Sequence, residues 1–293
     1  PSASAASNEA KKSMSQILRK TLLGPKIYEL VVAAPRIAKK AQPGQFLVVM
    51  ADESGERIPL TIADFDREEG TLTMVLAVVG ASSLKLSRME EGESLHAVIG
   101  PLGMPSELDH SGTVVMVAGG VGAAPIYPIA RAFYQAGNRV ITIQGSRSRD
   151  LLFWTARLAA VSDQHIITTD DGSVGRQGLV TEPLVGLLRD DAEKSISCVY
   201  AIGPAVMMKF CAAATQPFGV KTIVSLNTIM VDGTGMCGGC RVDVGGQTRF
   251  TCVDGPEFDG HQVNWPLLTA RQKTYTQHES CSLERYLQTS DRE

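Results

Sequence analysis

Short apolar runs separated by turn-forming residues fill the chain between positions 26 and 100. The runs are KIYELVV, GQFLVVM, IPLTIADF, TLTMVLAVV and ESLHAVI. The sequences PG, ESGE, REEG and EEGE lie between them, and the one short helical pattern lies near residues 83–88. Several strands at regular spacing with little helix predict a small antiparallel β-barrel or sandwich. We assign this domain to residues 14–108.

The pattern changes after Gly100. Near-continuous apolar strands are predicted at 113–118, 139–145, 165–170 and 197–203, with helices at 126–136, 151–161, 179–190 and 205–214. Strands without polar alternation are buried on both faces, and their alternation with helices predicts a parallel doubly wound sheet. This α/β domain is assigned to residues 109–222, after the Gly- and Pro-rich segment GPLGMPSELDHSG. The predicted fold class is therefore β plus α/β.

Residues 113–130, TVVMVAGGVGAAPIYPIA, carry no charge over a length that could cross a bilayer. Three glycines and two prolines interrupt this stretch, and its first half is β-branched. A buried strand, a glycine turn and a helix fit this pattern better than a membrane span.

Composition narrows the function classes. A chain of 293 residues with 44% hydrophobic residues can form two domains plus an appendage. Its net charge of -3 provides no basic surface for nucleic acid, so a small molecule or a protein is the expected partner. Residues 1–13 are expected to be disordered or a tag, with Met14 as the native start. Because no apolar signal sequence is recognisable there, we expect a cytoplasmic protein with reduced cysteines.

The glycine turn indicates a nucleotide site. Gly119, Gly120 and Gly122 lie between a predicted strand and helix, and Pro125 suits an early helical position. Glycines there let backbone N–H groups approach a pyrophosphate at a helix N-terminus. The fingerprint is imperfect, and by itself it fits a structural turn equally well. Ser146 and Arg147 follow the second strand, where adenosine recognition would lie, and they leave NAD(H) and NADP(H) both open.

A second motif collects three of the six cysteines. The spacing Asp232-x4-Cys237-x2-Cys240-x11-Cys252 is the plant-type [2Fe–2S] pattern with aspartate in the first position. Four nearby glycines let the backbone wrap closely around an anionic cluster. The alternative is structural zinc, although zinc ribbons usually present two Cys-x2-Cys pairs. We assign the cluster module to residues 223–265 and a helical tail to 266–293.

Other polar and thiol residues receive structural interpretations. Asp243 lies outside the ligand spacing and is expected to be a solvated strand residue. His261 is expected at the surface, with a hydrogen bond to a cluster ligand as the alternative. Cys198 and Cys211 fall on a predicted strand and helix and are expected in the core, and Cys281 is expected on a tail helix.

A hydride carries two electrons and a [2Fe–2S] centre accepts one, so a flavin is needed between them. The barrel contains Arg57-Ile58-Pro59-Leu60-Thr61-Ile62. This segment alone indicates only an edge strand, but it resembles the FAD-binding strand of the ferredoxin reductase superfamily, especially its dihydroorotate dehydrogenase electron-transfer branch. The resemblance implies that Arg57 pairs with the FAD pyrophosphate, that Thr61 lies near flavin N5, and that Leu60 replaces a stacking Tyr.

Further segments resemble the same superfamily over residues 15–280. Gly80-Ala81-Ser82-Ser83-Leu84 occupies the place of its second FAD loop, and Gly119 to Pro125 is similar to its nicotinamide loop. Thr169-Asp170-Asp171-Gly172-Ser173 is similar to its TDDGS turn. Gly203-Pro204-Ala205-Val206-Met207 is similar to its Cys-Gly-Pro-x-x-Met, with Ile202 in place of Cys. The resemblance thus implies cofactor contacts from Gly80, Ser82, Ser83, Asp170, Gly203, Pro204 and Met207.

With aspartate in the first ligand position, the cysteine motif resembles that of the small subunits of NADH-dependent ferredoxin:NADP oxidoreductases and sulfide dehydrogenases. The resemblance implies an electron-transfer subunit that uses NAD(H), FAD and a [2Fe–2S] cluster. It would serve a larger flavin and iron–sulfur subunit in bifurcation between NADH, ferredoxin and NADPH. Dihydroorotate or sulfide oxidation is one alternative, and a nucleotide-binding module with structural zinc is another. No nucleophile–base pair is apparent, so no catalytic side chain is predicted.

Overall fold

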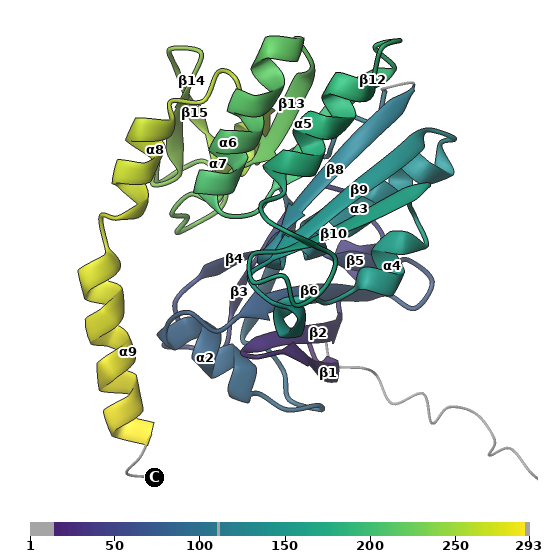
Figure 1. Ribbon diagram of the computed structural model, residues 1–293. Helices are drawn as coiled ribbons and strands as arrows, with labels where there is room; N and C mark the ends of the chain where they lie inside the picture. Colours follow the sequence, from purple (N-terminus) through teal and green to yellow (C-terminus); the bar gives the residue numbers. More distant parts are fainter. Residues whose placement is uncertain (1–14, 110–111, 291–293) are drawn as a thin grey trace, which may run out of the picture.

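The computed structural model describes residues 15–109 and 112–290, with the side chains of 289 and 290 excepted. The expected disordered segment and Met14 lie outside these residues. The chain forms a lower β domain, an upper α/β domain, and a C-terminal segment that runs down one side of both (Figure 1). This is the predicted combination of an antiparallel β domain and a doubly wound sheet. No helix of the described chain is long and apolar enough to cross a membrane.

Two antiparallel sheets and two short helices form the β domain. One sheet has the order β1-β2-β6-β5 and the other β4-β3-β7. The core between them is apolar and centres on Leu30, Leu47, Ile62 and Leu72, all fully buried. The elements are β1 (Ile17–Gly24), β2 (Ile27–Ala33), α1 (Pro35–Ala38), β3 (Phe46–Met50), β4 (Ile58–Thr61), β5 (Asp64–Asp66), β6 (Thr71–Ala77), α2 (Ala81–Arg88) and β7 (Ala97–Leu102).

Two features of this domain differ from the sequence prediction. The strand β1 was not expected, because ILRKTLLG mixes charged and apolar residues and its burial does not follow a clean alternation. The run IPLTIADF was expected as one strand, but Ile62 and Ala63 separate β4 from β5, which belong to different sheets. Both residues are fully buried, so this corner lies inside the domain.

The α/β domain contains a seven-stranded sheet of order β11-β10-β9-β8-β12-β13-β16. Helices α3 and α4 cover one face and α5 and α6 the other. The strands are β8 (Thr113–Gly119), β9 (Arg139–Ser146), β10 (Gln164–Thr169), β11 (Arg176–Gln177), β12 (Ile196–Ile202), β13 (Lys221–Ser225) and β16 (Glu257–Asp259). The helices are η1 (Gly120–Gly122), α3 (Ala123–Gln135), η2 (Arg149–Leu151), α4 (Thr155–Ala159), α5 (Thr181–Asp190), α6 (Ala205–Thr215) and η3 (Gln216–Phe218).

The uncharged stretch at 113–130 is the buried strand β8, the turn η1 and the first part of α3, as predicted. The helix predicted at 151–161 is shorter, with α4 preceded by the separate turn η2. Trp154 lies between the two in the left-handed region (φ 55°), which breaks the helix at that point.

The boundary predicted at 222/223 falls inside β13. This strand pairs in parallel with β12, and β16, from the predicted cluster module, pairs antiparallel with β13. A strand from beyond the cysteine stretch therefore extends the sheet of the α/β domain. The remaining elements of the module are β14 (Arg241–Val244), β15 (Gln247–Phe250) and α7 (Thr251–Asp254).

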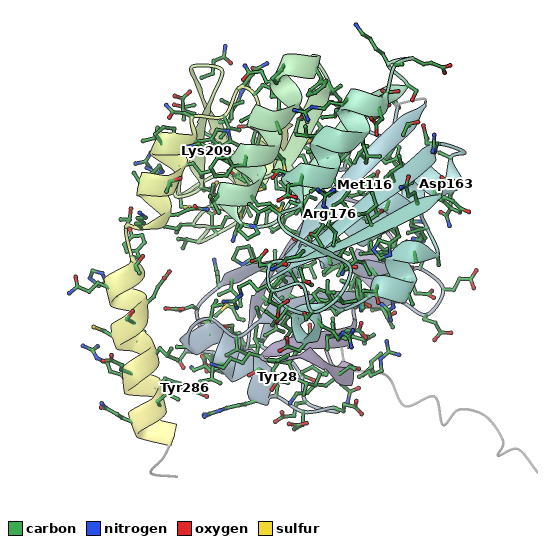
Figure 2. All side chains as sticks on the ribbon, viewed as in Figure 1. Tyr28, Met116, Asp163, Arg176, Lys209 and Tyr286 are labelled. Atoms are coloured by element: carbon green, nitrogen blue, oxygen red, sulfur yellow. The ribbon has the colours of Figure 1, made fainter. Side chains whose placement is uncertain are left out.

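Two helices form the tail, α8 (Trp265–Gln272) and α9 (Thr276–Ser290). Trp265 and Leu268 of α8 join the core of the α/β domain. Helix α9 instead runs alongside α2 of the β domain, and Tyr286 marks the contact in Figure 2. The cationic groups of Lys85 and Arg88 lie 5.6 and 5.2 Å from the Tyr286 ring centroid.

A buried carboxylate joins the β domain to the α/β domain. Glu29 of β2 is 3% exposed and accepts a hydrogen bond from Trp154 Nε1 at 3.0 Å. Arg19 and Arg157 lie 3.1 and 3.4 Å from its carboxylate oxygens, one from each domain. This cluster of polar contacts fixes how the carboxyl edge of the parallel sheet faces the β domain.

Candidate functional site

The glycine turn after β8 meets the loop after β12. A Cβ added at Gly119 would overlap the thioether of Met207, and one at Gly122 would overlap the Ile202 carbonyl. A Cβ added at Gly203 would lie 3.1 Å from Gly119 Cα. The structure therefore brings these predicted nicotinamide-loop residues together, along with Pro204 and with Pro125 in α3.

Gly120 has a different role from its two neighbours. Its φ is +53°, and a Cβ added there would meet nothing within 4 Å. The turn thus has one side packed against β12 and one open side at the start of α3. An open glycine backbone at a helix N-terminus fits the approach of a pyrophosphate.

The residues predicted to contact the adenosine part of the nucleotide also lie close together. Asp170 N–H donates to the Ser146 carbonyl at 3.1 Å, and Asp171 N–H donates to the Arg147 carbonyl at 3.2 Å. Ser146 Oγ donates to the Ser148 carbonyl at 2.6 Å. The ends of β9 and β10 are therefore joined at the same carboxyl edge as the glycine turn, where nucleotides bind to doubly wound sheets.

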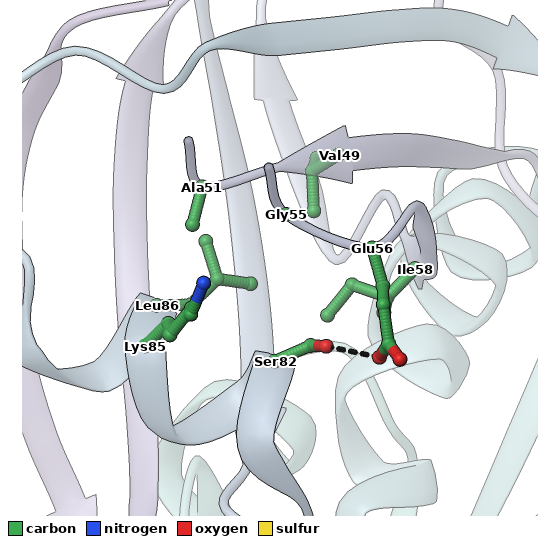
Figure 3. A pocket seen from close by; sticks show the side chains of 8 residues that line it. All are labelled: Val49, Ala51, Gly55, Glu56, Ile58, Ser82, Lys85 and Leu86. Carbon is green, nitrogen blue, oxygen red and sulfur yellow. Dashed lines mark hydrogen bonds between the residues drawn. The ribbon is translucent and has the colours of Figure 1, made fainter. Parts of the chain in front are cut away.

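The two predicted FAD segments lie next to each other in the β domain. β4 carries Pro59, Leu60 and Thr61, and Arg57 immediately precedes it in an exposed position. Ser82, in the first turn of α2, donates a hydrogen bond to Glu56 (Figure 3). Ile62 N–H donates to the Gln45 carbonyl, which ties the end of β4 to β3.

Ser83 shapes the start of α2 rather than facing outward. Its hydroxyl accepts from the N–H groups of Val79 and Gly80 at 2.9 and 3.0 Å, and the side chain is 9% exposed. A Cβ at Gly80 would meet nothing within 4 Å. The first-turn N–H groups that follow Gly80 have no partner within the helix and are available to a phosphate.

Lys85 and Glu56 are candidate site residues that the sequence did not single out. Both line the hollow between β3 and α2 that Figure 3 shows, together with Ser82. A hydrogen bond from the Ser54 hydroxyl keeps the pKa of Asp52 below its ordinary value, and Lys85 Nζ, which lies 3.0 Å from Asp52 Oδ2, adds to this effect. The sequence signal that could have indicated Lys85 is its position one turn into a helix whose N-cap is Gly80.

The four predicted cluster ligands lie in the segment that runs from the end of β13 into helix α7. Cys240 Sγ and Cys252 Sγ are 3.2 Å apart and both residues are buried. Asp232 accepts hydrogen bonds from the N–H groups of Thr234 and Cys237 at 2.6 and 2.8 Å. The Gly239 N–H donates to Cys237 Sγ at 3.4 Å, as expected of glycines that direct N–H groups at sulfur. The structure therefore brings together Asp232 with the backbone of Cys237, and Cys240 with Cys252.

This donor set, three thiols and one carboxylate in the plant-type spacing, favours a two-iron cluster, in which each iron takes two protein ligands. Tetrahedral zinc would bind all four side chains on one atom. Within the described part of the chain, no three His, Cys, Asp or Glu side chains are gathered around one position.

The protonation states of these ligands follow their surroundings. Hydrogen bonds from the Thr234 and Cys237 N–H groups hold the pKa of Asp232 below its ordinary value, so the carboxylate is ionised and able to coordinate metal. Burial, reinforced by neighbouring Cys240, raises the pKa of the Cys252 thiol to about 12. A thiolate at Cys252 therefore requires a compensating cation, which iron supplies.

The other polar and thiol residues take structural positions. Cys198 and Cys211 are fully buried, and burial raises the pKa of each thiol to about 12; Cys281 is exposed on α9. His261 Nε2 lies 2.9 Å from Thr215 Oγ1, so it links the module to α6. Asp243 is not solvated as expected, since Oδ2 accepts from Asn264 at 2.9 Å and Oδ1 is buried.

The cysteine loop packs directly on the β domain. Cys240, Cys252 and Met230 form one buried cluster with Phe46 and Val48 of β3. In the β3–β4 ladder, Phe46 pairs with Thr61 and Val48 pairs with Pro59. The strand that supports the buried thiols is therefore the direct neighbour of the predicted flavin strand.

Comparisons with known proteins agree with this geometry. The family model described as the iron–sulfur cluster binding domain of dihydroorotate dehydrogenase B matches residues 227–264, and the oxidoreductase NAD-binding domain matches residues 116–213. A Thermotoga maritima protein, the electron transfer subunit homolog of dihydroorotate dehydrogenase B (NAD(+)), is 45% identical over 95% of this chain and 97% of its own. An uncharacterized Clostridium beijerinckii protein is also 45% identical, over 91% and 92% of the two chains.

Solved structures show the same fold. A chain from the structure of an NADH-dependent reduced ferredoxin-NADP oxidoreductase, a flavin-based electron-bifurcating enzyme, superposes with a TM-score of 0.89 at 44% identity, covering 95% of this chain and 99% of that one. Phthalate dioxygenase reductase, at 16% identity and a TM-score of 0.55 over 78% and 85% of the two chains, shows the fold alone.

The fold and these sites define an electron-transfer oxidoreductase of the ferredoxin reductase type, in which an NAD-binding domain is followed by an iron–sulfur domain. The chain belongs to the family of dihydroorotate dehydrogenase B electron transfer subunits. The family predicted from the sequence is thereby confirmed.

Proposed function

We propose that this chain passes electrons between NAD(H), an FAD in the β domain and a [2Fe–2S] cluster held by Asp232, Cys237, Cys240 and Cys252. The observation that carries the proposal is the packing of Cys240 and Cys252 on β3, next to the flavin strand β4. Bound FAD supplies the exchange between a two-electron hydride and single electrons. The protein supplies the short, dry connection between the two sites.

Each group of residues has a defined task in this proposal. The glycine turn and the loop after β12 hold the nicotinamide nucleotide at the carboxyl edge of the sheet. The first turn of α2, with Ser82 and Lys85, holds the FAD phosphates, and Thr61 supports the flavin ring. NAD(H) is the nucleotide proposed, because the oxidoreductase NAD-binding domain model matches residues 116–213.

The exposed face of the cluster loop is the proposed contact with a larger flavoprotein subunit. Met236 is 85% exposed and Val231 56% exposed, and both flank cluster ligands; Cys237 is itself exposed. Apolar side chains exposed around a redox loop favour a protein partner that excludes water there. The related solved enzyme supports bifurcation between NADH, ferredoxin and NADP. The curated relative favours dihydroorotate dehydrogenase as the alternative.

Metal and flavin analysis after anaerobic purification tests the proposal. Two irons, two acid-labile sulfides and one FAD per chain are expected, together with bleaching of the flavin and cluster bands by NADH. Cys240→Ser should lose the iron, whereas Cys281→Ser, on the exposed tail helix, should keep it. A colourless protein that contains zinc would refute the proposal, and iron in the Cys240→Ser variant would refute the ligand assignment.

A further inference from the structure

A notch lies behind the cysteine loop, between the cluster module and α8. It is a small hollow that opens to solvent, and it is lined by Thr228, Ile229, Gly239, Arg241, Leu268, Arg271 and Gln272. Ile229 and Leu268 give it an apolar side. None of the residues that line it is acidic, so its charge comes from the two arginines.

The guanidinium groups of Arg241 and Arg271 each donate one hydrogen bond to the cysteine loop, and their other N–H groups remain available. Arg241 Nη1 donates to the Gly238 carbonyl at 3.1 Å, and Arg271 Nη2 donates to the Gly239 carbonyl at 3.0 Å. A guanidinium has five N–H groups. Among the described residues, no carboxylate lies within ion-pair distance of either arginine. Both positive charges therefore lack a counterion within the part of the chain that the structure describes.

The third polar group of the notch is a buried hydroxyl. Thr228 is 8% exposed, and its Oγ1 has no hydrogen-bond partner among the described residues. A buried polar atom without a partner costs free energy unless a ligand or water satisfies it. The unpartnered hydroxyl is independent of the arginines, and it points to an occupant with acceptor atoms.

From this geometry we infer that the notch binds a single oxyanion group, a phosphate or a carboxylate, between Arg241, Arg271 and the Thr228 hydroxyl. Two guanidinium forks and a hydroxyl match the acceptor oxygens of either anion. The source is a free anion such as inorganic phosphate or an acidic side chain of a partner subunit. The opening to solvent admits both.

The anion site is linked to the proposed cluster, and this link alone rests on the proposed function. Gly238 and Gly239, whose carbonyls the arginines hold, lie between Cys237 and Cys240. A reduced cluster carries one more negative charge, so a bound anion disfavours reduction. By reciprocity the oxidised protein should bind the anion several-fold more tightly than the reduced protein.

Calorimetric titration of the purified subunit with inorganic phosphate tests the site. Saturable binding is expected, weakened about tenfold or more in Arg271→Met and Thr228→Val, because each removes a donor to a charged ligand. Arg249→Met is the matched control, since Arg249 lies in the same module and donates only to Gln247 of its own strand. It should bind phosphate like the wild type.

Thr228→Val provides a second readout that does not depend on binding heats. It removes the unpartnered hydroxyl at nearly constant volume, so the variant should melt higher than the wild type in phosphate-free buffer and should gain less from added phosphate. Binding of equal strength in all variants, or no saturable binding by the wild-type subunit, would overturn the site. These results are obtained whether or not a cluster is present.

Two further titrations identify the source of the anion and test the coupling between the anion site and the cluster. If the source is a carboxylate of a partner, phosphate binding will be lost when the subunit is titrated within its native complex; if the source is a free anion, it will persist. Titration of oxidised and dithionite-reduced protein tests the link. Equal affinity for phosphate in the two states would show that the site and the cluster are not coupled.

Discussion

Glu257, the first residue of β16, is a buried acid at the junction of the β domain, the α/β sheet and the cluster module. Its Oε1 accepts from Ser106 Oγ at 2.7 Å, and a Cβ added at Gly44 would lie 2.7 Å from the same oxygen. Burial raises the pKa of Glu257 from 4.5 to about 7; the Ser106 hydrogen bond opposes this shift and the charge of Glu107 adds to it. Tyr200 faces the same carboxyl.

The direction of the pH effect follows from this raised pKa. Between pH 4.5 and about 7 the folded chain keeps a proton on Glu257 that the unfolded chain releases. The stability must therefore fall as pH rises through this window, and the loss is complete above about pH 7. At about 1.4 kcal/mol per pKa unit, the change amounts to about 3 kcal/mol.

Glu257→Gln removes the ionisation and retains an acceptor for Ser106. The variant should match the wild type at pH 4.5 and exceed its free energy of unfolding by about 3 kcal/mol at pH 8. Urea unfolding followed by circular dichroism at several pH values measures the difference. Glu182→Gln is the control, because this exposed acid of α5 pairs with Arg176 and does not act on Glu257. A difference between Glu257→Gln and wild type that stays constant with pH would refute the reasoning.

Three further substitutions test other parts of the structure. Gly122→Ala should destabilise the chain by about 1–3 kcal/mol in thermal unfolding and weaken NADH binding, because the new Cβ overlaps a β12 carbonyl; Gly186→Ala, in open space on α5, should not destabilise it. Glu29→Gln should lower the free energy of urea unfolding by about 2 kcal/mol, because two arginines and Trp154 lose a charged acceptor. Asp232→Cys should retain a cluster with a shifted reduction potential, since thiolate is a softer ligand than carboxylate; an unchanged redox titration would remove Asp232 from the ligand set.

The sequence was informative where the signal is local. Strands such as β8 and β9 are buried on both faces, so their residues are mostly apolar and could be recognised without knowledge of the partners. The glycine turn and the Asp–Cys spacing were also visible, because covalent spacing along one loop sets the ligand geometry. Such features do not depend on distant segments.

Features that depend on distant segments could not be predicted in this way. β16 is only three residues long, EFD, and it is a strand because Val224 and its neighbours offer a free edge of the sheet. Glu29 has the sequence appearance of an exposed strand residue, yet Trp154 buries it from 125 positions away. Lys85 is a candidate for the FAD site only because β3 and α2 enclose a common hollow.

The antiparallel edge strand also explains how the predicted cofactor sites keep a fixed separation. β16 anchors the C-terminal end of the cysteine loop to the parallel sheet, and Met104 N–H, which follows β7, donates to the Gly255 carbonyl at 2.7 Å. The loop is thus bound on one side to the nucleotide sheet and on the other to the β domain. A rigid connection of this kind suits electron transfer, because a change of distance between the flavin strand and the buried thiols would require the rupture of strand pairing as well as of the contact with β3.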